Sequence, residues 1–173
     1  AQPGFDRQTA QAILDQVAKE GRTLLTEPES KSLLRAYGIG APEIVVAHSS
    51  DEVGEVAARM LESNRALVVK LYSRQITHKS DVGGVVLNLR SAEDARAAAA
   101  RMTERVEQQY GREAIEGFAV QPMISRPQAQ ELIAGLSVDP IFGPVLLFGA
   151  GGTAVEVVDD TSTELLPIDP PLA

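Results

Sequence analysis

Apolar and polar residues alternate along the chain in two patterns, one typical of helices and one typical of strands. Apolar positions recur at helical spacing over residues 6–20, 26–37, 49–61 and 91–110. Short runs of β-branched and apolar residues, which favour strands, cover residues 43–47, 66–71 and 84–89. The first part of the chain is therefore expected to alternate between helices and strands.

Two of the expected helices begin with a capping box, in which Ser or Thr and Glu side chains bond the free N–H groups of the first turn. Thr26 stands three residues before Glu29, and Pro28 occupies the first turn, where a missing N–H costs little. Ser49 and Glu52 repeat the pattern. The expected buried face of the helix after Thr26 consists of Leu33, Leu34 and Tyr37.

From residue 116 onwards, strands are expected to predominate. Apolar runs separated by Pro- and Gly-containing turns cover residues 116–123, 130–137, 144–149 and 153–158. Residues 165–173 contain three prolines and no periodic pattern, so they are expected to be a linker or a cut end.

The whole pattern predicts an α+β fold with two lobes joined by a strand-like hinge. The expected parts are an N-terminal helix or linker at 1–21, a small lobe at 22–118, and the hinge with the start of a second lobe at 119–173.

The amino-acid composition excludes several kinds of site and several classes of protein. With 173 residues, 44% of them hydrophobic, the chain can bury one core or two small lobes that share a cleft. The lack of cysteine excludes disulfides, thiolate metal sites and cysteine nucleophiles. No apolar run reaches the roughly 18 residues of a membrane span, and no signal-peptide pattern occurs, so a cytoplasmic protein without membrane contact is expected. A net charge of −8 argues against nucleic-acid binding, which needs clustered Lys and Arg.

One window of this acidic chain is basic. Residues 70–79 contain Lys70, Arg74, His78 and Lys79 and no carboxylate. A basic loop in an acidic protein favours a small anionic ligand.

The segment 68–89 resembles a phosphate cradle. Lys70 near the end of an apolar strand supplies a fixed charge, and Gly83 and Gly84 let backbone N–H groups approach anionic oxygens. On the residues alone, a hairpin turn explains the two glycines equally well. Lys70 could likewise be a strand-end residue whose ammonium reaches water.

Longer motifs follow one another in the order LLTEPESKSLLRAYGI, VVKLYSRQITHKSDVGGV, VQPM, ELIAG, DPIFGPVLLFGAGG and VEVV. This order resembles the ATP-grasp portion of ADP-forming (NDP-forming) acyl-CoA synthetases over residues 24–166, and the THKSDVGGV block is distinctive for that group. The same module closes the chain of bacterial protein lysine acetyltransferases. The resemblance implies a two-lobe ATP-grasp fold whose second lobe is incomplete here, because the family usually continues for several more elements.

The resemblance also implies roles around the basic loop. Lys70 would contact an ATP phosphate, and the loop 77–84 would close over the triphosphate. The loop residues expected beside the phosphates are Lys79, Ser80, Gly83 and Gly84. His78 is similar to a histidine proposed in the synthetases to accept a phosphoryl group and pass it to ADP, which suits an imidazole near pH 7. The alternative is a loop residue that only forms hydrogen bonds.

Further along, the resemblance places a hinge beside the adenine ring. The residues whose backbone would read the adenine edge are Ala119, Val120, Gln121 and Met123. Glu131 would lie near the nucleotide and its magnesium. The alternatives are an ordinary buried strand and a solvent-facing glutamate.

The ligands implied by the resemblance are ATP or ADP with magnesium (Mg2+), and CoA on a separate domain or subunit. Glu156 and the Asp159-Asp160 pair suggest a metal site, but such pairs are usually solvated, so no metal ligands are assigned. The family's Asn-Pro segment with magnesium ligands does not occur before Ala173. The chain alone is therefore expected to bind nucleotide weakly or not at all, without turnover.

Two functions agree with the sequence. One is the nucleotide module of an ADP-forming acyl-CoA synthetase, in which a phosphoryl group moves between the nucleotide and a histidine. The other is a regulatory module of a protein lysine acetyltransferase that senses nucleotide or acyl-CoA. The two differ in what His78 does.

Overall fold

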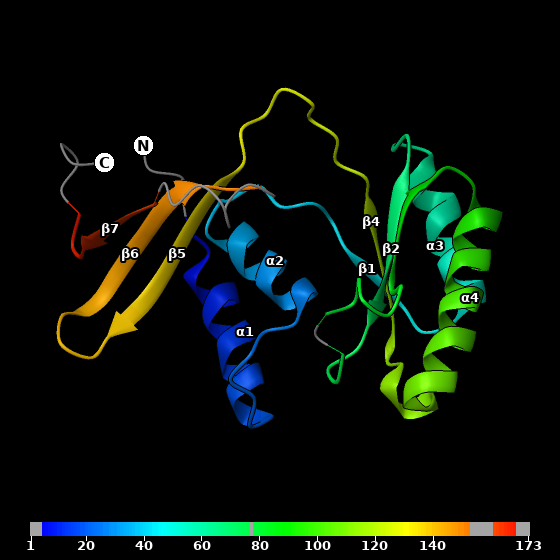
Figure 1. The fold of residues 1–173 in the computed structure, drawn as a ribbon, viewed down its shortest axis with the longest axis horizontal. Coiled ribbons are helices and arrows are strands. Elements are labelled where there is room, and N and C mark those ends of the chain that lie inside the picture. Colours follow the sequence, from blue (N-terminus) through cyan, green and yellow to red (C-terminus); the bar gives the residue numbers. More distant parts are fainter. Residues whose placement is uncertain (1–4, 77, 153–160, 169–173) are drawn as a thin grey trace. The chain divides into compact units, whose positions relative to one another are not determined.

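The computed structural model describes residues 5–76, 78–152 and 161–168. The chain folds into two compact units, Ala1–Ile124 and Ser125–Ala173 (Figure 1).

The first unit is built on an antiparallel sheet in which β4 lies between β1 and β2. The strands, in sheet order, are β1 (Val45–Ala47), β4 (Gly117–Pro122), β2 (Leu67–Tyr72) and β3 (Val85–Leu89). Val45 pairs with Val120 across β1 and β4, and Lys70 pairs with Ala119 across β2 and β4. The strands expected before residue 90 are confirmed. Residues 119–122, expected at the hinge, are the last four residues of β4 in this unit.

Two helices cover one face of this sheet: α3 (Ser50–Leu61) and α4 (Ala92–Tyr110) (Figure 1). Alternate residues of β2, Leu67, Val69 and Leu71, are fully buried in the core beneath them. The residues that α4 adds include Ala95, Ala98 and Ala99, whose small side chains allow close packing. Each fully buried Val or Leu stabilises the fold by about 1.5–3 kcal/mol, so this layer is a main source of stability. Among the helices that the structure describes, none is long and apolar enough to cross a membrane.

The first two helices, α1 (Arg7–Lys19) and α2 (Glu27–Ala36), pack against each other. The capping box at Thr26 is confirmed, because Thr26 Oγ1 accepts from the Glu29 N–H and Glu29 Oε2 accepts from the Thr26 N–H at 2.7 Å. The expected buried face is wrong. Leu33 is partly buried, but Leu34 and Tyr37 are 41% and 45% exposed, since a pair of short helices covers only part of each apolar face.

At the start of α3, only one of the two hydrogen bonds of the expected capping box forms. Ser49 Oγ accepts from the Glu52 N–H at 3.1 Å, as the pattern predicted. The Glu52 carboxylate, however, accepts from the His48 N–H at 2.7 Å. The reciprocal bond has therefore moved back by one residue along the chain.

The described residues of the second unit form an antiparallel sheet in the order β5-β6-β7. Its strands are β5 (Leu132–Asp139), β6 (Gly143–Ala150) and β7 (Thr161–Leu165). The strands expected at 130–137 and 144–149 are confirmed as β5 and β6. The strand expected at 153–158 lies outside the described residues, and β7 was not expected.

Candidate functional site

Lys70 lies on the face of the sheet opposite α3 and α4. The β2 residues that point to those helices are Leu67, Val69 and Leu71. Lys70 alternates with them and so points to the other side. Its ammonium donates to Glu27 Oε1 at 2.5 Å, in the first turn of α2. Both side chains are partly buried, with 23% and 27% exposed, so the ammonium is paired within the fold.

Two lysines share the Glu27 carboxylate. Lys31, one turn further along α2, donates to the same oxygen at 3.0 Å and to Gln121 Oε1 on β4 at 2.6 Å. Burial raises the pKa of Glu27, but the hydrogen bonds from Lys70 and Lys31 outweigh burial, so the pKa lies below its ordinary value. Glu27 is thus ionised between two ammonium groups and leaves the group with a net positive charge. Lys70, Glu27, Lys31 and Gln121 form the Glu27 bridge.

The loop after β2 closes into a tight turn that uses its own backbone donors. The Gly83 N–H donates to the Ser80 carbonyl at 3.0 Å, and the Gly84 N–H donates to the Lys79 carbonyl at 2.7 Å. The Gly84 carbonyl accepts from the Leu71 N–H at 2.7 Å. Either glycine N–H would therefore have to exchange its partner to reach a phosphate oxygen.

The backbone conformation at Gly83 and crowding at Gly84 explain why these positions are glycine. Gly83 has a φ of +64°, and a Cβ there would lie 1.7 Å from Nη1 of Arg105 on α4. A Cβ on Gly84 would lie 2.9 Å from the Lys79 carbonyl oxygen and 3.1 Å from Leu71 Cβ. The turn needs glycine for its own packing, whether or not it binds a phosphate.

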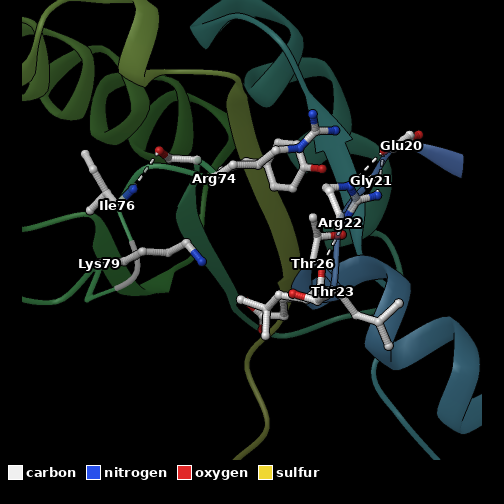
Figure 2. A pocket seen from close by; sticks show the side chains of 13 residues that line it. Glu20, Gly21, Arg22, Thr23, Thr26, Arg74, Ile76 and Lys79 are labelled. Atoms are coloured by element: carbon white, nitrogen blue, oxygen red, sulfur yellow. Dashed lines mark hydrogen bonds and ion pairs between the residues drawn. The ribbon is translucent and has the colours of Figure 1, made fainter. Parts of the chain in front are cut away.

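A pocket of about 960 Å³ adjoins this loop. Its walls are residues 20–27 between α1 and α2, residues 72–74 at the end of β2, Ile76 and Lys79. The Lys79 side chain extends from the loop toward the side of the pocket where Thr23 and Thr26 lie (Figure 2). Lys79 and Glu27 both line this pocket, and Lys70 reaches its wall through the bond to Glu27.

The arginines of the pocket are already paired. Their ion pairs are Arg22–Glu20 at 2.8 Å, Arg22–Glu29 at 2.7 Å and Arg74–Glu116 at 3.3 Å. The hydrogen bonds from Arg22 lower the pKa of Glu29 to about 2. Lys79 has no ion pair with any residue that the structure describes. Among the described cations of the pocket, its ammonium can therefore bind an anionic ligand without breaking an ion pair.

His78 and Ser80 are exposed on either side of Lys79. The His78 carbonyl accepts from the Asp81 N–H at 3.2 Å, while the imidazole has no hydrogen bond to the described part of the chain. The His78 side chain is therefore open to solvent. Thr77, expected in the same loop, lies outside the described residues.

The expected hinge residues lie in different surroundings. Val120 is fully buried in the core under α3 and α4, and its backbone lies between β1 and β2. Gln121 lies past the end of β1 and pairs with Val68 on β2. The Met123 N–H donates to the Ala66 carbonyl at 2.8 Å. The adenine contacts stay a prediction. The backbones of Gln121 and Met123 have fewer strand neighbours than the backbone of Val120.

Glu131 belongs to the second unit and is exposed. Its carbonyl accepts from the Gly151 N–H at 2.7 Å. A pocket of about 600 Å³ beside it is lined by residues 130–132 and 148–151 and by Ser162. Its expected place beside a nucleotide stays a prediction.

Within the described ranges, no three His, Cys, Asp or Glu side chains lie close enough to hold a metal ion. Glu156 and the Asp159-Asp160 pair fall outside those ranges. The described residues therefore form no ready-made magnesium site by themselves.

Comparison with known proteins decides the family. A family model for an ATP-grasp domain matches residues 16–173. The chain belongs to the ATP-grasp domain family. This ATP-grasp chain is 36% identical over 159 residues to the acetate–CoA ligase [ADP-forming] I subunit beta of Pyrococcus furiosus, covering 92% of this chain and 66% of that protein. It is 35% identical to the 4-hydroxybutyrate–CoA ligase [ADP-forming] of Nitrosopumilus maritimus, covering 92% of this chain and 22% of that protein.

Solved structures agree with this ATP-grasp assignment. The dinucleotide forming acetyl-coenzyme A synthetase 1 of Ca. Korarchaeum cryptofilum, in complex with coenzyme A, Ca-AMPCP and HgCl+, has a TM-score of 0.82 and 37% identity. That match covers 94% of this chain and 69% of the solved chain. The same protein in complex with coenzyme A and Mg-AMPPCP, its phosphohistidine segment pointing towards the nucleotide binding site, has a TM-score of 0.73 and 33% identity. The expected α+β ATP-grasp fold is confirmed.

Sequence reasoning missed two residues of the candidate site, Glu27 and Lys31. Their spacing of four residues in a helix is a local signal, but it predicts only an ordinary surface ion pair. The contact with Lys70 arises from the fold. Arg105, which packs against Gly83, left no signal in the sequence.

Proposed function

We propose that this chain is the nucleotide-binding module of an ADP-forming acyl-CoA synthetase and that Lys70 and Lys79 hold the phosphate tail of ATP or ADP. One observation carries the proposal: Lys79, which has no ion pair in the described chain, lines a pocket whose wall includes Glu27, the carboxylate that Lys70 bonds. An unpaired ammonium in a pocket with a second ammonium bonded to its wall suits a polyphosphate.

The relatives support this choice of reaction. The curated proteins are named ADP-forming ligases of acetate and 4-hydroxybutyrate, and the solved synthetase holds coenzyme A together with nucleotide analogues. A phosphoryl group therefore moves, in this proposal, between nucleotide and an acyl phosphate. CoA binds on a separate domain or subunit, and the reaction takes place in the cytoplasm.

His78 is the residue proposed to relay the phosphoryl group. A neutral imidazole nitrogen attacks the phosphorus of a phosphohistidine on the CoA-binding part, so one N–P bond forms as the other breaks. A terminal oxygen of ADP then attacks the same phosphorus, which yields ATP and the free His78 imidazole. The exposed position of His78 beside Lys79 supports this role, since the incoming histidine needs access.

Other expected contacts complete the proposed site. Ser80, Gly83 and Gly84 would approach the phosphates after their turn opens, and Gln121 and Met123 would face the adenine. Glu131 is proposed to lie near the nucleotide. Magnesium would enter with the nucleotide and neutralise phosphate charge. The described residues offer no ready metal cluster, so its protein ligands are not assigned.

The test is equilibrium dialysis of ATP and ADP with the protein that carries this chain, because the chain alone is expected to bind weakly. Lys70→Met and Lys79→Met should each weaken ATP binding about tenfold or more, since a charged hydrogen bond contributes about 1.5–3 kcal/mol. Lys19→Met removes the same charge from an exposed position on α1 and serves as the control. Wild-type affinity in both site variants, or no nucleotide binding by the unmodified protein, would refute the proposal.

A further inference from the structure

The Glu27 bridge joins three elements that the sequence keeps apart. Glu27 starts α2, Lys70 lies on β2 and Gln121 lies on β4. Lys31 links Glu27 to Gln121, at 3.0 Å from the carboxylate and 2.6 Å from the amide oxygen. The bridge therefore connects the proposed phosphate lysine to the proposed adenine hinge.

The first turn of α2, which carries the Glu27 carboxylate, is itself held in place by hydrogen bonds. Thr26 caps the helix in front of it, and Glu29 in the same turn is bonded by Arg22 at 2.7 Å. The first turn of α2 is thus fixed to the connector that forms the pocket wall. A carboxylate anchored in this way can orient a partner, because the lysine side chain is otherwise free to take many rotamers.

The charges in the Glu27 bridge determine which donors remain available for a ligand. Lys70 and Lys31 each donate to Glu27 Oε1, so without the carboxylate two neighbouring ammonium groups would repel each other and move apart. With Glu27 present, the lysines stay together and the group remains net positive. An ammonium has three donors, so Lys70 keeps donors for a phosphate while one is used by Glu27.

We propose that Glu27 and Lys31 are positioning residues that hold the Lys70 ammonium in place for a nucleotide phosphate and tie it to Gln121. This inference rests on the proposed nucleotide binding. In the opposite arrangement, Glu27 occupies the Lys70 ammonium in place of a phosphate and must be displaced by ATP. Removal of the Glu27 charge would then tighten ATP binding instead of weakening it.

The experiment compares ATP with adenosine, which lacks the phosphate tail, by equilibrium dialysis on the whole protein. Glu27→Gln should raise the dissociation constant of ATP about tenfold and leave that of adenosine within about twofold, because a charge-assisted hydrogen bond is lost only at the phosphate end. Glu93→Gln is the matched control, since it removes the same charge from an exposed pair with Arg96. Urea denaturation checks that the variants are folded.

Lys31→Met is the second variant, in case Glu27→Gln does not fold. It leaves the Lys70–Glu27 pair in place and removes the side-chain link to Gln121, so ATP binding should weaken about threefold. Adenosine binding should not change, because the backbone of Gln121, which is proposed to face the adenine, stays paired with β2. Equal weakening of ATP and adenosine would indicate a merely structural role and overturn the inference.

Other outcomes separate the inference from the proposed function. If Lys70→Met loses ATP while Glu27→Gln binds ATP as tightly as the wild type or more tightly, the positioning role is wrong and the nucleotide site stands. If the unmodified protein binds no ATP, the proposed function fails and the inference falls with it.

Discussion

Lys70 Nζ and Glu27 Oε1 lie 2.5 Å apart although the two residues are 43 positions apart in the sequence. The pair joins a strand near the middle of the sheet to the first turn of a helix from the N-terminal pair. It keeps the candidate phosphate lysine paired within the fold and close to the pocket that Lys79 enters.

Removal of Lys70 should cost stability as well as nucleotide affinity. Lys70→Met takes one of two partners from a partly buried carboxylate, so we expect a loss of about 1–2 kcal/mol in the free energy of unfolding. A double-mutant cycle with Glu27→Gln, measured by urea denaturation, should give a coupling of at least about 0.5 kcal/mol. Strict additivity of the two single variants would show that the pair contributes nothing to folding.

Replacement of Gly83 should destabilise the loop for two separable reasons. Gly83→Ala introduces a Cβ at a φ of +64° and 1.7 Å from Arg105 Nη1, and we expect a loss of about 2 kcal/mol. Adding Arg105→Ala should recover the part caused by the clash and leave the backbone part. Gly40→Ala, where a Cβ would meet nothing within 4 Å, is the control. An equal effect at Gly40 and Gly83 would contradict this account.

The Arg22–Glu29 pair should make stability depend on acid pH. The pKa of Glu29 is lowered to about 2 in the folded protein from an ordinary 4.5. A lowered pKa stabilises the fold above the unfolded value, so this contribution should be lost as the pH falls from 4.5 towards 2. Glu29→Gln should flatten the pH dependence of urea unfolding in that window, whereas Glu93→Gln should leave the Glu29 contribution intact. An unchanged pH profile in Glu29→Gln would disprove the assignment.

Removal of the His78 imidazole should separate phosphoryl transfer from binding. Because the residue is exposed, His78→Ala should change the free energy of unfolding by less than about 0.5 kcal/mol and leave ATP affinity nearly unchanged. Mass spectrometry of the intact protein follows the phosphorylated enzyme intermediate. In His78→Ala the phosphate bound to this loop should be missing, and phosphate should no longer be transferred to ADP. Wild-type transfer to ADP in His78→Ala would exclude the relay.

The local features of this protein were readable in its sequence. The cap at Thr26, the apolar run of β2 and the helical spacing of α4 depend on neighbours a few residues away, so hydrophobic and capping patterns predicted them. The sequence also placed Lys70 near a strand end in front of a basic loop. Its motifs identified the ATP-grasp family.

Only the tertiary structure decided which distant residues meet. The insertion of β4 between β1 and β2, the approach of Arg105 to Gly83 and the sharing of Glu27 by Lys70 and Lys31 each join segments far apart in the chain. Sequence periodicity reports which face of an element is apolar but not which element covers it. For that reason α2 was expected to bury Leu34 and Tyr37, while in the fold its polar first turn makes the contact with the sheet.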